Sequence, residues 1–173
     1  IVCVWLQGAG EKAFCAGGDI VSMYHAAQAK PKEMVPEVVE FFTREYRLDH
    51  QIQTYPKPFV VWGDGFVMGG GLGLMIGASH RIVTERSRLA MPEISIGLYP
   101  DVGGTYFLSR LPEGMGLFLG LTATQVNATD ACWLGMADVA LNAEQHESAL
   151  HALCAIHWTD SAEVNRSRVS DAL

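Results

Sequence analysis

The sequence predicts an α/β protein folded around a single core. Short apolar runs typical of buried strands alternate with stretches whose apolar residues recur at helical spacing. Glycine-rich turns separate these segments, and nothing repeats with a period of about 20 to 50 residues. Of the 173 residues, 49% are hydrophobic and 18% are charged. A chain of this length buries about 70% of its unfolded surface, so we expect one domain over residues 1–173.

The first eighty residues predict two strands and three helices. Residues 1–6 read as a buried strand, and a glycine-punctuated loop over 8–18 leads into a helix over 19–29. Apolar residues recur at helical spacing over 37–53, and this helix ends before Pro56 and Pro58. The prolines force an extended approach to a strand over 59–62. A turn at 63–65 and a glycine loop at 68–73 precede an apolar helix that ends near residue 79.

The second half predicts short strands followed mainly by helices. Two strands, 81–84 and 88–91, flank a turn at 85–86, and 97–104 is a loop rich in proline and glycine. Helical stretches follow at 105–110, 114–121 and 124–135. A strand at 139–141 and a helix at 144–158 complete the order of elements. The last dozen residues are polar, and we expect them to be frayed.

Composition excludes several classes of partner. The net charge is −7 and the 12 Lys and Arg residues are scattered, which argues against nucleic acid, whereas a small anionic ligand held locally is compatible. The longest apolar stretch, 66–78, contains five glycines and is shorter than the ~20 residues of a membrane span, and we expect no signal peptide. The spacing of the cysteines predicts reduced thiols in a cytosol-like compartment: Cys3, Cys15, Cys132 and Cys154.

Two glycine-rich loops are candidate anion sites. Residues 14–19 (FCAGGD) and 68–73 (MGGGLG) each place glycines between a strand and the first turn of a helix. Backbone N–H groups there lack intrahelical partners. No Lys-Ser or Lys-Thr follows either loop, and the second loop lacks Gly-x-Gly-x-x-Gly, so a nucleotide site is disfavoured. The loops can form an oxyanion hole. The alternative is that the glycines serve only tight turns and close packing.

Glu93 and Asp101 are candidate acid–base residues. Each stands next to a proline among apolar neighbours, which fixes the backbone and raises the pKa of a carboxyl group. The alternative is a pair of solvated or capping carboxylates, with Asp101 capping the next helix. Glu45, on an amphipathic helix, reads from its pattern as a solvated residue.

Other common catalytic patterns are absent from the sequence. The six histidines show neither a His-x-x-x-His spacing nor a Glu paired between two of them as a zinc peptidase requires, so we expect no metal site and read them as surface or capping residues. No Gly-x-Ser-x-Gly elbow is present, which argues against a serine hydrolase.

Together, the run 12–20 (KAFCAGGDI) and the run 68–74 (MGGGLGL) strongly resemble the enoyl-CoA hydratase/isomerase (crotonase) superfamily over residues 1–141. The resemblance implies a crotonase-like spiral of ββα units and an acyl-CoA substrate. It places the oxyanion hole on the N–H groups of Gly18 and Gly70. It also implies that neighbouring residues of the loops bind substrate: Gly17, Asp19 and Gly71.

Residues 91–108 and 41–46 resemble the 3-hydroxyisobutyryl-CoA hydrolase branch of that superfamily. This implies catalytic roles for Glu93 and Asp101 and substrate binding by Glu45. Hydratases with two catalytic glutamates carry the second where this chain has Gly73. Members of the branch extend further at both ends and the chain starts without methionine in mid-strand, so we expect a partial domain, truncated at both ends.

The implied function is hydrolysis of 3-hydroxyisobutyryl-CoA to 3-hydroxyisobutyrate and coenzyme A, a step of valine catabolism. Two alternatives stay open: an enoyl-CoA hydratase or isomerase, and a non-catalytic acyl-CoA-binding fragment. The resemblance implies no cofactor beyond the coenzyme A of the substrate and is compatible with a homo-oligomer of trimer type, while composition and spacing predict no metal and no nucleic-acid or membrane partner. It implies the cytoplasm of a bacterium or the mitochondrial matrix of a eukaryote.

Overall fold

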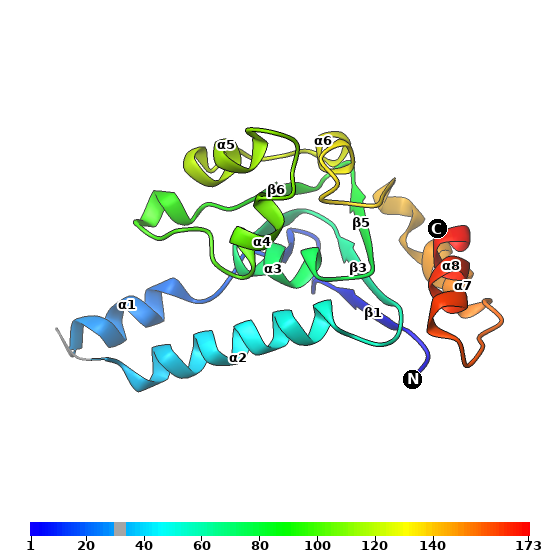
Figure 1. Cartoon of the computed structure of the whole chain (residues 1–173), viewed down its shortest axis with the longest axis horizontal. Helices are drawn as coiled ribbons and strands as arrows, with labels where there is room; N and C mark the ends of the chain where they lie inside the picture. Colours follow the sequence, from blue (N-terminus) through cyan, green and yellow to red (C-terminus); the bar gives the residue numbers. More distant parts are fainter. Residues whose placement is uncertain (30–33) are drawn as a thin grey trace.

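The computed structural model describes residues 1–29 and 34–173, in which seven short strands form two parallel sheets (Figure 1). The larger sheet has the order β1 (Val4–Gln7), β3 (Phe59–Gly63), β5 (His80–Thr84) and β7 (Val139–Leu141). The smaller sheet has the order β2 (Ala13–Cys15), β4 (Phe66–Met68) and β6 (Arg88–Ala90).

Successive strands alternate between the two sheets. β1, β3 and β5 each lie in the larger sheet, and the strand after each of them lies in the smaller one. In the first two pairs the chain then enters a helix, and after β6 it enters the 3₁₀ helix η1 (Glu93–Ile96). This order confirms the expected spiral of ββα units and makes every strand pairing in the two sheets parallel.

The pattern analysis missed β2, which lies in the predicted glycine loop over 8–18, and β4, which lies between the predicted turn at 63–65 and the glycine loop that begins at Met68. Each has three residues and is followed closely by a glycine run. Three residues are too short for alternation of polar and apolar side chains to be recognised, and pairing with a neighbouring strand supplies the order that local sequence does not. The two strands are important for the site because each glycine-rich loop begins where one of them ends.

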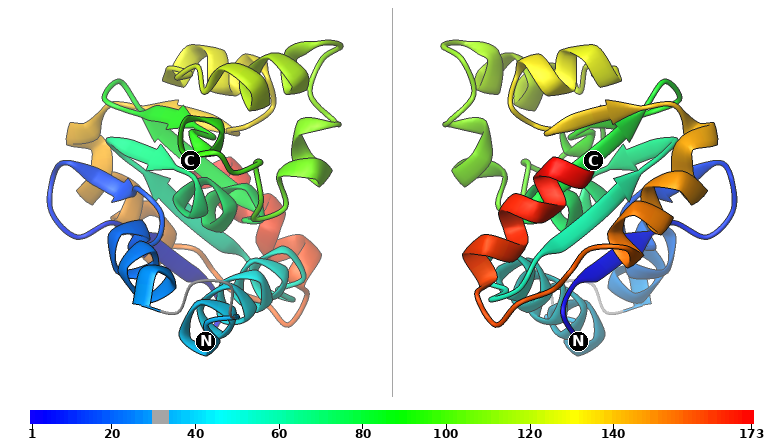
Figure 2. Two further views of the ribbon diagram at one scale, coloured as in Figure 1. Left: turned by 90° about the vertical axis from the view of Figure 1, so that its left-hand side faces the viewer. Right: turned by 90° about the vertical axis from the view of Figure 1, so that its right-hand side faces the viewer.

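Helices cover both faces of the larger sheet (Figure 2). All seven helices expected over residues 19–158 are present, with boundaries shifted by a few residues. They are α1 (Ile20–Ala29), α2 (Pro36–Gln53), α3 (Gly70–Ile76), α4 (Gly104–Leu108), α5 (Met115–Thr122), α6 (Ala128–Trp133) and α7 (His146–Cys154), which the 3₁₀ helix η2 (Ala143–Gln145) precedes.

The core lies in two clusters separated by the larger sheet. Side chains of a strand alternate between faces, so Val61 and Val83 point into the cluster that contains α3 and the smaller sheet. Val60, Trp62 and Ile82 point to the opposite cluster, against α7 and a further C-terminal helix. Burial on both faces explains why these strands read as continuous apolar runs.

The expectation of a frayed end is wrong, because α8 (Ala162–Ala172) is a regular helix packed on the sheet. Ser161 caps it by accepting a hydrogen bond from the Val164 N–H at 3.3 Å. Val169 is fully buried among apolar side chains of the second cluster. The apolar residues of this mostly polar helix do not recur at helical spacing over enough positions for the pattern to be recognised in the sequence.

The reading of the histidines as surface or capping residues is wrong for His80, which is only 7% exposed. Its Nε2 lies 3.1 Å from the carbonyl oxygen of Arg166 and its Nδ1 lies 2.9 Å from the Ser79 hydroxyl. His80 therefore links β5 to α8. The four cysteines are unpaired thiols. None of the helices in the described part of the chain combines the length and apolar character needed to cross a membrane.

Candidate active site

The two glycine loops and Glu93 leave neighbouring strands at one edge of the smaller sheet. Cys15 of β2 pairs with Val67 of β4, and Met68 pairs with Ala90 of β6. Because these strands are parallel, the segments that follow them emerge side by side. Ligands of parallel sheets commonly bind beyond such carboxyl ends.

The backbones of the two loops meet at Gly17 and Gly70. Gly17 has a φ of 97°, and a Cβ atom there would lie 3.5 Å from the amide nitrogen of Gly70. A Cβ on Gly18 would lie 2.5 Å from a ring carbon of Phe41, and one on Gly71 would overlap the carbonyl oxygen of Cys15. The glycines therefore do serve close packing, and this packing also brings the backbones of the two loops together.

Gly70 is the first residue of α3, so the helix itself provides no acceptor for its N–H group. The residue before it, Gly69, adopts a φ of 54° and donates its own N–H to the Ala90 carbonyl, 3.1 Å away. This bond ties the start of α3 to β6. Gly70 is thereby held in a defined orientation beside Gly17.

Glu93 and Glu45 lie on either side of this glycine run. A Cβ on Gly69 would lie 2.8 Å from Oε1 of Glu93, and a Cβ on Gly70 would overlap Oε1 of Glu45. Glu93 begins η1, while Glu45 projects from α2, so two separate elements deliver the carboxylates. The structure places Glu45 at the site, although its pattern alone favoured a solvated residue.

Burial perturbs both carboxyl groups. Glu93 is 7% exposed, and within the described structure its Oε2 is buried without a hydrogen-bond partner. Burial raises the pKa of Glu93, and the charge of Asp101 raises it further. The pKa of Glu45 is raised by burial first and then by the charges of Asp101 and Glu93. Carboxyl groups with raised pKa values can take up and release protons closer to neutral pH.

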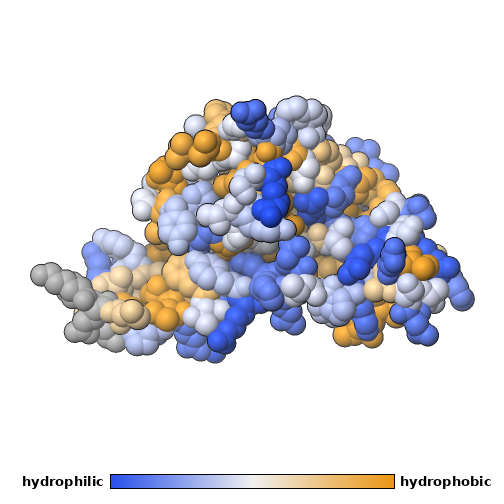
Figure 3. Space-filling view, in the orientation of Figure 1, coloured by the Kyte–Doolittle hydropathy of each residue, from blue (hydrophilic) through white to orange (hydrophobic). Residues whose placement is uncertain are grey.

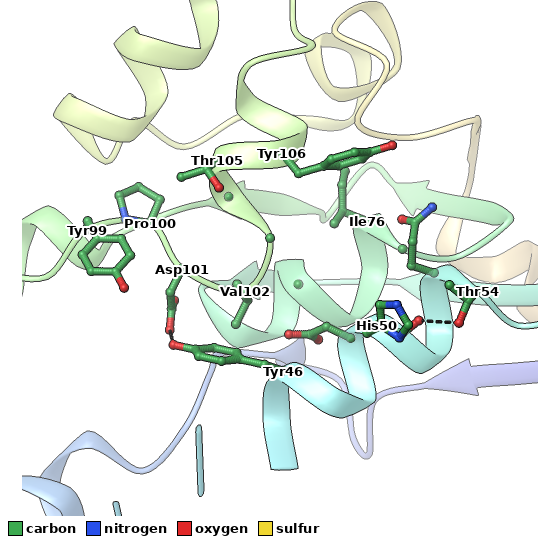
Figure 4. A pocket seen from close by; sticks show the side chains of 16 residues that line it. Tyr46, His50, Thr54, Ile76, Tyr99, Pro100, Asp101, Val102, Thr105 and Tyr106 are labelled. Atoms are coloured by element: carbon green, nitrogen blue, oxygen red, sulfur yellow. Dashed lines mark hydrogen bonds between the residues drawn. The ribbon is translucent and has the colours of Figure 1, made fainter. Parts of the chain in front are cut away.

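Asp101 lies on the loop between η1 and α4 and faces α2 (Figure 4). The Tyr46 hydroxyl donates a hydrogen bond of 2.7 Å to its Oδ2. The capping alternative is wrong: Gly103 occupies the N-cap position of α4, and no side chain caps that helix. Asp101 therefore belongs to the same group of carboxylates as Glu45 and Glu93.

Val102 occupies the space in which a side chain at position 73 would lie. It has a φ of 41°, unusual for a residue with a side chain, and it is 3% exposed. A Cβ on Gly73 would lie 2.5 Å from the Cβ of Val102. The backbone of the Asp101 loop is thus anchored on α3, and position 73 has no room for a glutamate.

Asp49 is a fourth carboxylate that the sequence analysis missed. It lies one helical turn after Glu45 on α2, and this four-residue spacing was the signal that could have revealed it. Both carboxylate oxygens are buried without a hydrogen-bond partner in the described structure. Burial raises the pKa of Asp49 to about 7, with further contributions from the charges of Glu45 and Asp101.

A cavity of about 530 Å³, lined by Asp49 and Asp101 but not by Glu45 or Glu93, opens between α2, the end of α3 and residues 99–106 (Figure 4). Tyr46, Asp49 and Asp101 contribute polar groups to its lining, while Ile76 and Val102 contribute apolar ones. In the view of Figure 3, apolar residues gather over α5 and over α1 with the start of α2.

Asp19 has a structural partner. Its carboxylate accepts hydrogen bonds from the Ser22 N–H at 3.0 Å and the Ser22 hydroxyl at 2.6 Å, which stabilise the first turn of α1. These bonds lower the pKa of Asp19. Within residues 1–29 and 34–173, no group of three or more His, Cys, Asp and Glu side chains is arranged to hold a metal ion.

Comparison with known proteins reveals a family match along almost the whole chain. Residues 1–172 match the family model described as enoyl-CoA hydratase/isomerase. A mitochondrial 3-hydroxyisobutyryl-CoA hydrolase of Danio rerio is 46% identical over 145 residues, which are 84% of this chain and 37% of that protein. Small ribosomal subunit protein mS47 of Neurospora crassa is 45% identical over 148 residues, 86% of this chain and 28% of that protein.

Solved structures agree with this match. A carnitinyl-CoA dehydratase from Mycobacterium thermoresistibile superposes with a TM-score of 0.84 at 40% identity, covering 100% of this chain and 46% of that one. An enoyl-CoA hydratase from Rhodobacter sphaeroides gives a TM-score of 0.83 at 40% identity, covering 88% of this chain and 44% of that one. The chain thus spans less than half the length of each relative named here.

Proposed function

The chain belongs to the enoyl-CoA hydratase/isomerase family, and from this premise we propose that it hydrolyses a short 3-hydroxyacyl-CoA thioester, 3-hydroxyisobutyryl-CoA. The observation that carries the proposal is the buried carboxylate of Glu93 beside the junction of the glycine loops. The named hydrolase relative, 46% identical, supports the choice of substrate.

In the proposed reaction, the thioester oxygen lies between the N–H groups of Gly18 and Gly70. These donors stabilise the negative charge that develops on this oxygen when the carbonyl carbon is attacked, and each is worth about 10²–10³ in rate. Glu93 either takes a proton from the attacking water or attacks the carbonyl itself, forming an anhydride that water then hydrolyses. In both routes the C–S bond breaks, one water is consumed, and the free acid and the thiol of coenzyme A are released.

Asp101 and Glu45 contribute binding and orientation in this proposal. Asp101 orients the substrate hydroxyl or the water, and Glu45 contacts substrate beside Gly70, with Gly17, Asp19 and Gly71 forming the surrounding loops. No cofactor is needed beyond the coenzyme A of the substrate, because hydrolysis involves no redox change. Oligomerisation of trimer type and a place in valine catabolism, in the mitochondrial matrix of a eukaryote or the cytoplasm of a bacterium, complete the proposal.

Hydration of an enoyl-CoA is the second candidate, favoured by the solved hydratase and dehydratase structures. Two-glutamate hydratases need an acid–base group at the position of Gly73. A Cβ there would overlap Val102, so position 73 cannot supply one without a rearrangement of the loop. This packing supports hydrolysis over two-glutamate hydration.

The experiment that tests the proposal follows thiol release from 3-hydroxyisobutyryl-CoA and loss of double-bond absorbance from crotonyl-CoA. We expect thiol release from the first thioester alone. Glu93→Gln should retain binding and lower kcat by at least about 10²-fold, because the variant cannot act as base or nucleophile. Glu40→Gln, an exposed glutamate of α2 paired with Arg44, is the matched control and should be unchanged.

Each other outcome would revise the proposal. Loss of crotonyl absorbance without thiol release would establish a hydratase. Full thiol release by Glu93→Gln would remove Glu93 from the mechanism. Tight binding of both thioesters without turnover would establish a non-catalytic acyl-CoA-binding chain.

A further inference from the structure

In the described part of the chain, one side-chain hydrogen bond reaches the Asp101 carboxylate, whereas packing and a hydrogen bond hold the backbone around it. Val102, the next residue, is buried against Gly73, and the Asp101 carbonyl accepts a hydrogen bond from the Gly104 N–H. These contacts fix the loop but leave the carboxylate free to rotate. The hydrogen bond from Tyr46 to Oδ2 selects one orientation.

Tyr46 is well placed to hold the Asp101 carboxylate in one orientation. It projects from the long helix α2 directly after Glu45, and its ring packs against Phe42 with centroids 5.7 Å apart. Figure 4 shows its hydroxyl directed at Asp101 across the edge of the cavity. Burial and the hydrogen bond to Asp101 raise the pKa of Tyr46, so the phenol keeps the proton that it donates.

The hydrogen bond leaves half of the Asp101 carboxylate available. Asp101 lines the cavity, and within the described structure its Oδ1 receives no hydrogen bond. A carboxylate oxygen accepts a hydrogen bond from an alcohol but gains nothing from a hydrogen on carbon. A site built to accept a hydroxyl discriminates strongly against the analogue that lacks it, because its polar group then loses a partner.

We propose that Tyr46 is a positioning residue that orients Asp101 so that Oδ1 recognises the 3-hydroxyl group of the acyl-CoA substrate. The inference rests on the proposed function and deepens it, because it assigns the choice between hydroxylated and plain acyl groups to the Tyr46–Asp101 pair. Glu93 and the glycine loops act on the thioester carbonyl, which both kinds of substrate share.

The test compares 3-hydroxyisobutyryl-CoA with isobutyryl-CoA, which lacks only the hydroxyl. Tyr46→Phe keeps the ring on Phe42 and removes the donor. We expect it to lower kcat/KM for the hydroxylated thioester about tenfold, the usual effect of losing a hydrogen bond to a charged group, with little change for isobutyryl-CoA. Tyr55→Phe, two residues beyond the end of α2, is the matched control and should change neither value.

A double-mutant cycle separates positioning from a general structural role. Asp101→Asn should lose the same discrimination, and adding Tyr46→Phe to it should cost nothing further, because Tyr46 acts through Asp101. Equal losses for both thioesters, or fully additive losses in the double variant, would overturn the proposal.

Failure of the proposed function is distinguishable from failure of this inference. If the unmodified chain releases no thiol from either thioester, hydrolysis is wrong, and calorimetric binding of the same two thioesters replaces the rates. Tyr46→Phe should then weaken only the hydroxylated ligand about tenfold. Equal weakening of both ligands, no change, or no binding of either thioester to the unmodified chain would overturn the role of Tyr46.

Discussion

Replacing Asp49 by Asn should make the stability of the protein less sensitive to pH. Asp49 is a buried carboxyl group with two unpartnered oxygens, and its pKa is about 7 in the folded chain against 3.8 for an ordinary aspartate. Its burial is the largest cause, followed by the charges of Glu45 and Asp101. Asparagine has the same shape and no charge, so the substitution removes the titration and preserves the packing.

The sign follows from the preference of the folded state for the protonated form. Below pH 3.8 both states carry a protonated Asp49, so the group has no effect on the free energy of unfolding. As the pH rises from 3.8 to about 7, the unfolded chain ionises freely and the folded chain does not, so stability is lost; above about 7 the loss is complete. A pKa difference of about three corresponds to about 4 kcal/mol in the free energy of unfolding. Because Asp49 is partly exposed, solvent screening should reduce this loss to roughly half.

The assay is urea denaturation of both proteins at about pH 5 and about pH 8. Part of the loss has already occurred by pH 5, so the unmodified chain should lose about 1 kcal/mol more than Asp49→Asn between these conditions. The amide of the Asp49→Asn variant has its own unmet hydrogen bonds, but their cost does not vary with pH. The prediction therefore concerns how the difference in free energy of unfolding between the two proteins changes from about pH 5 to about pH 8. If the difference in free energy of unfolding between the two proteins is the same at both pH values, the assignment of the titration to Asp49 is wrong.

Two further changes test packing and a second titration. Gly73→Ala should lower the free energy of unfolding by about 1–3 kcal/mol, because the added Cβ overlaps Val102; an unchanged Tm would show that the loop yields freely. Burial lowers the pKa of His80, so the unmodified chain should lose stability as the pH falls through about 6.5, where the unfolded chain gains its proton. His80→Gln should reduce that loss in urea denaturation, and equal acid sensitivity would contradict the assignment.

Pattern analysis located the longer strands and most of the helices because their signals are local. The strand β3 and the helix α2 each carry enough consecutive residues for their periodicity to be recognised. The short strands β2 and β4 lack such a signal, since their order comes from pairing with each other. Helix α8 was missed because its sequence is mostly polar and its two buried residues, Asn165 and Val169, form no apolar stripe.

The candidate site was also predictable in part, because some of its signals are local in the sequence. The glycine runs and the prolines beside Glu93 and Asp101 are visible in the sequence, since they restrict or free the backbone locally. The contribution of Asp49 is not, because its four-residue spacing from Glu45 acquires meaning only when the other carboxylates are known to face that side of α2. Tyr46 was likewise invisible, because its partner Asp101 lies 55 residues away along the chain.

The sequence by itself determined which groups were available: two glycine loops with close backbone approach, carboxylates on stiffened backbone, and the family resemblance. Only the tertiary structure decided which of them lie together. The parallel pairing of β2, β4 and β6 brings the loops and Glu93 to one edge, and α2 closes over that edge with Glu45, Tyr46 and Asp49. The physical reason is that pKa values and hydrogen bonds depend on distances and burial in space, which strand pairing and packing set.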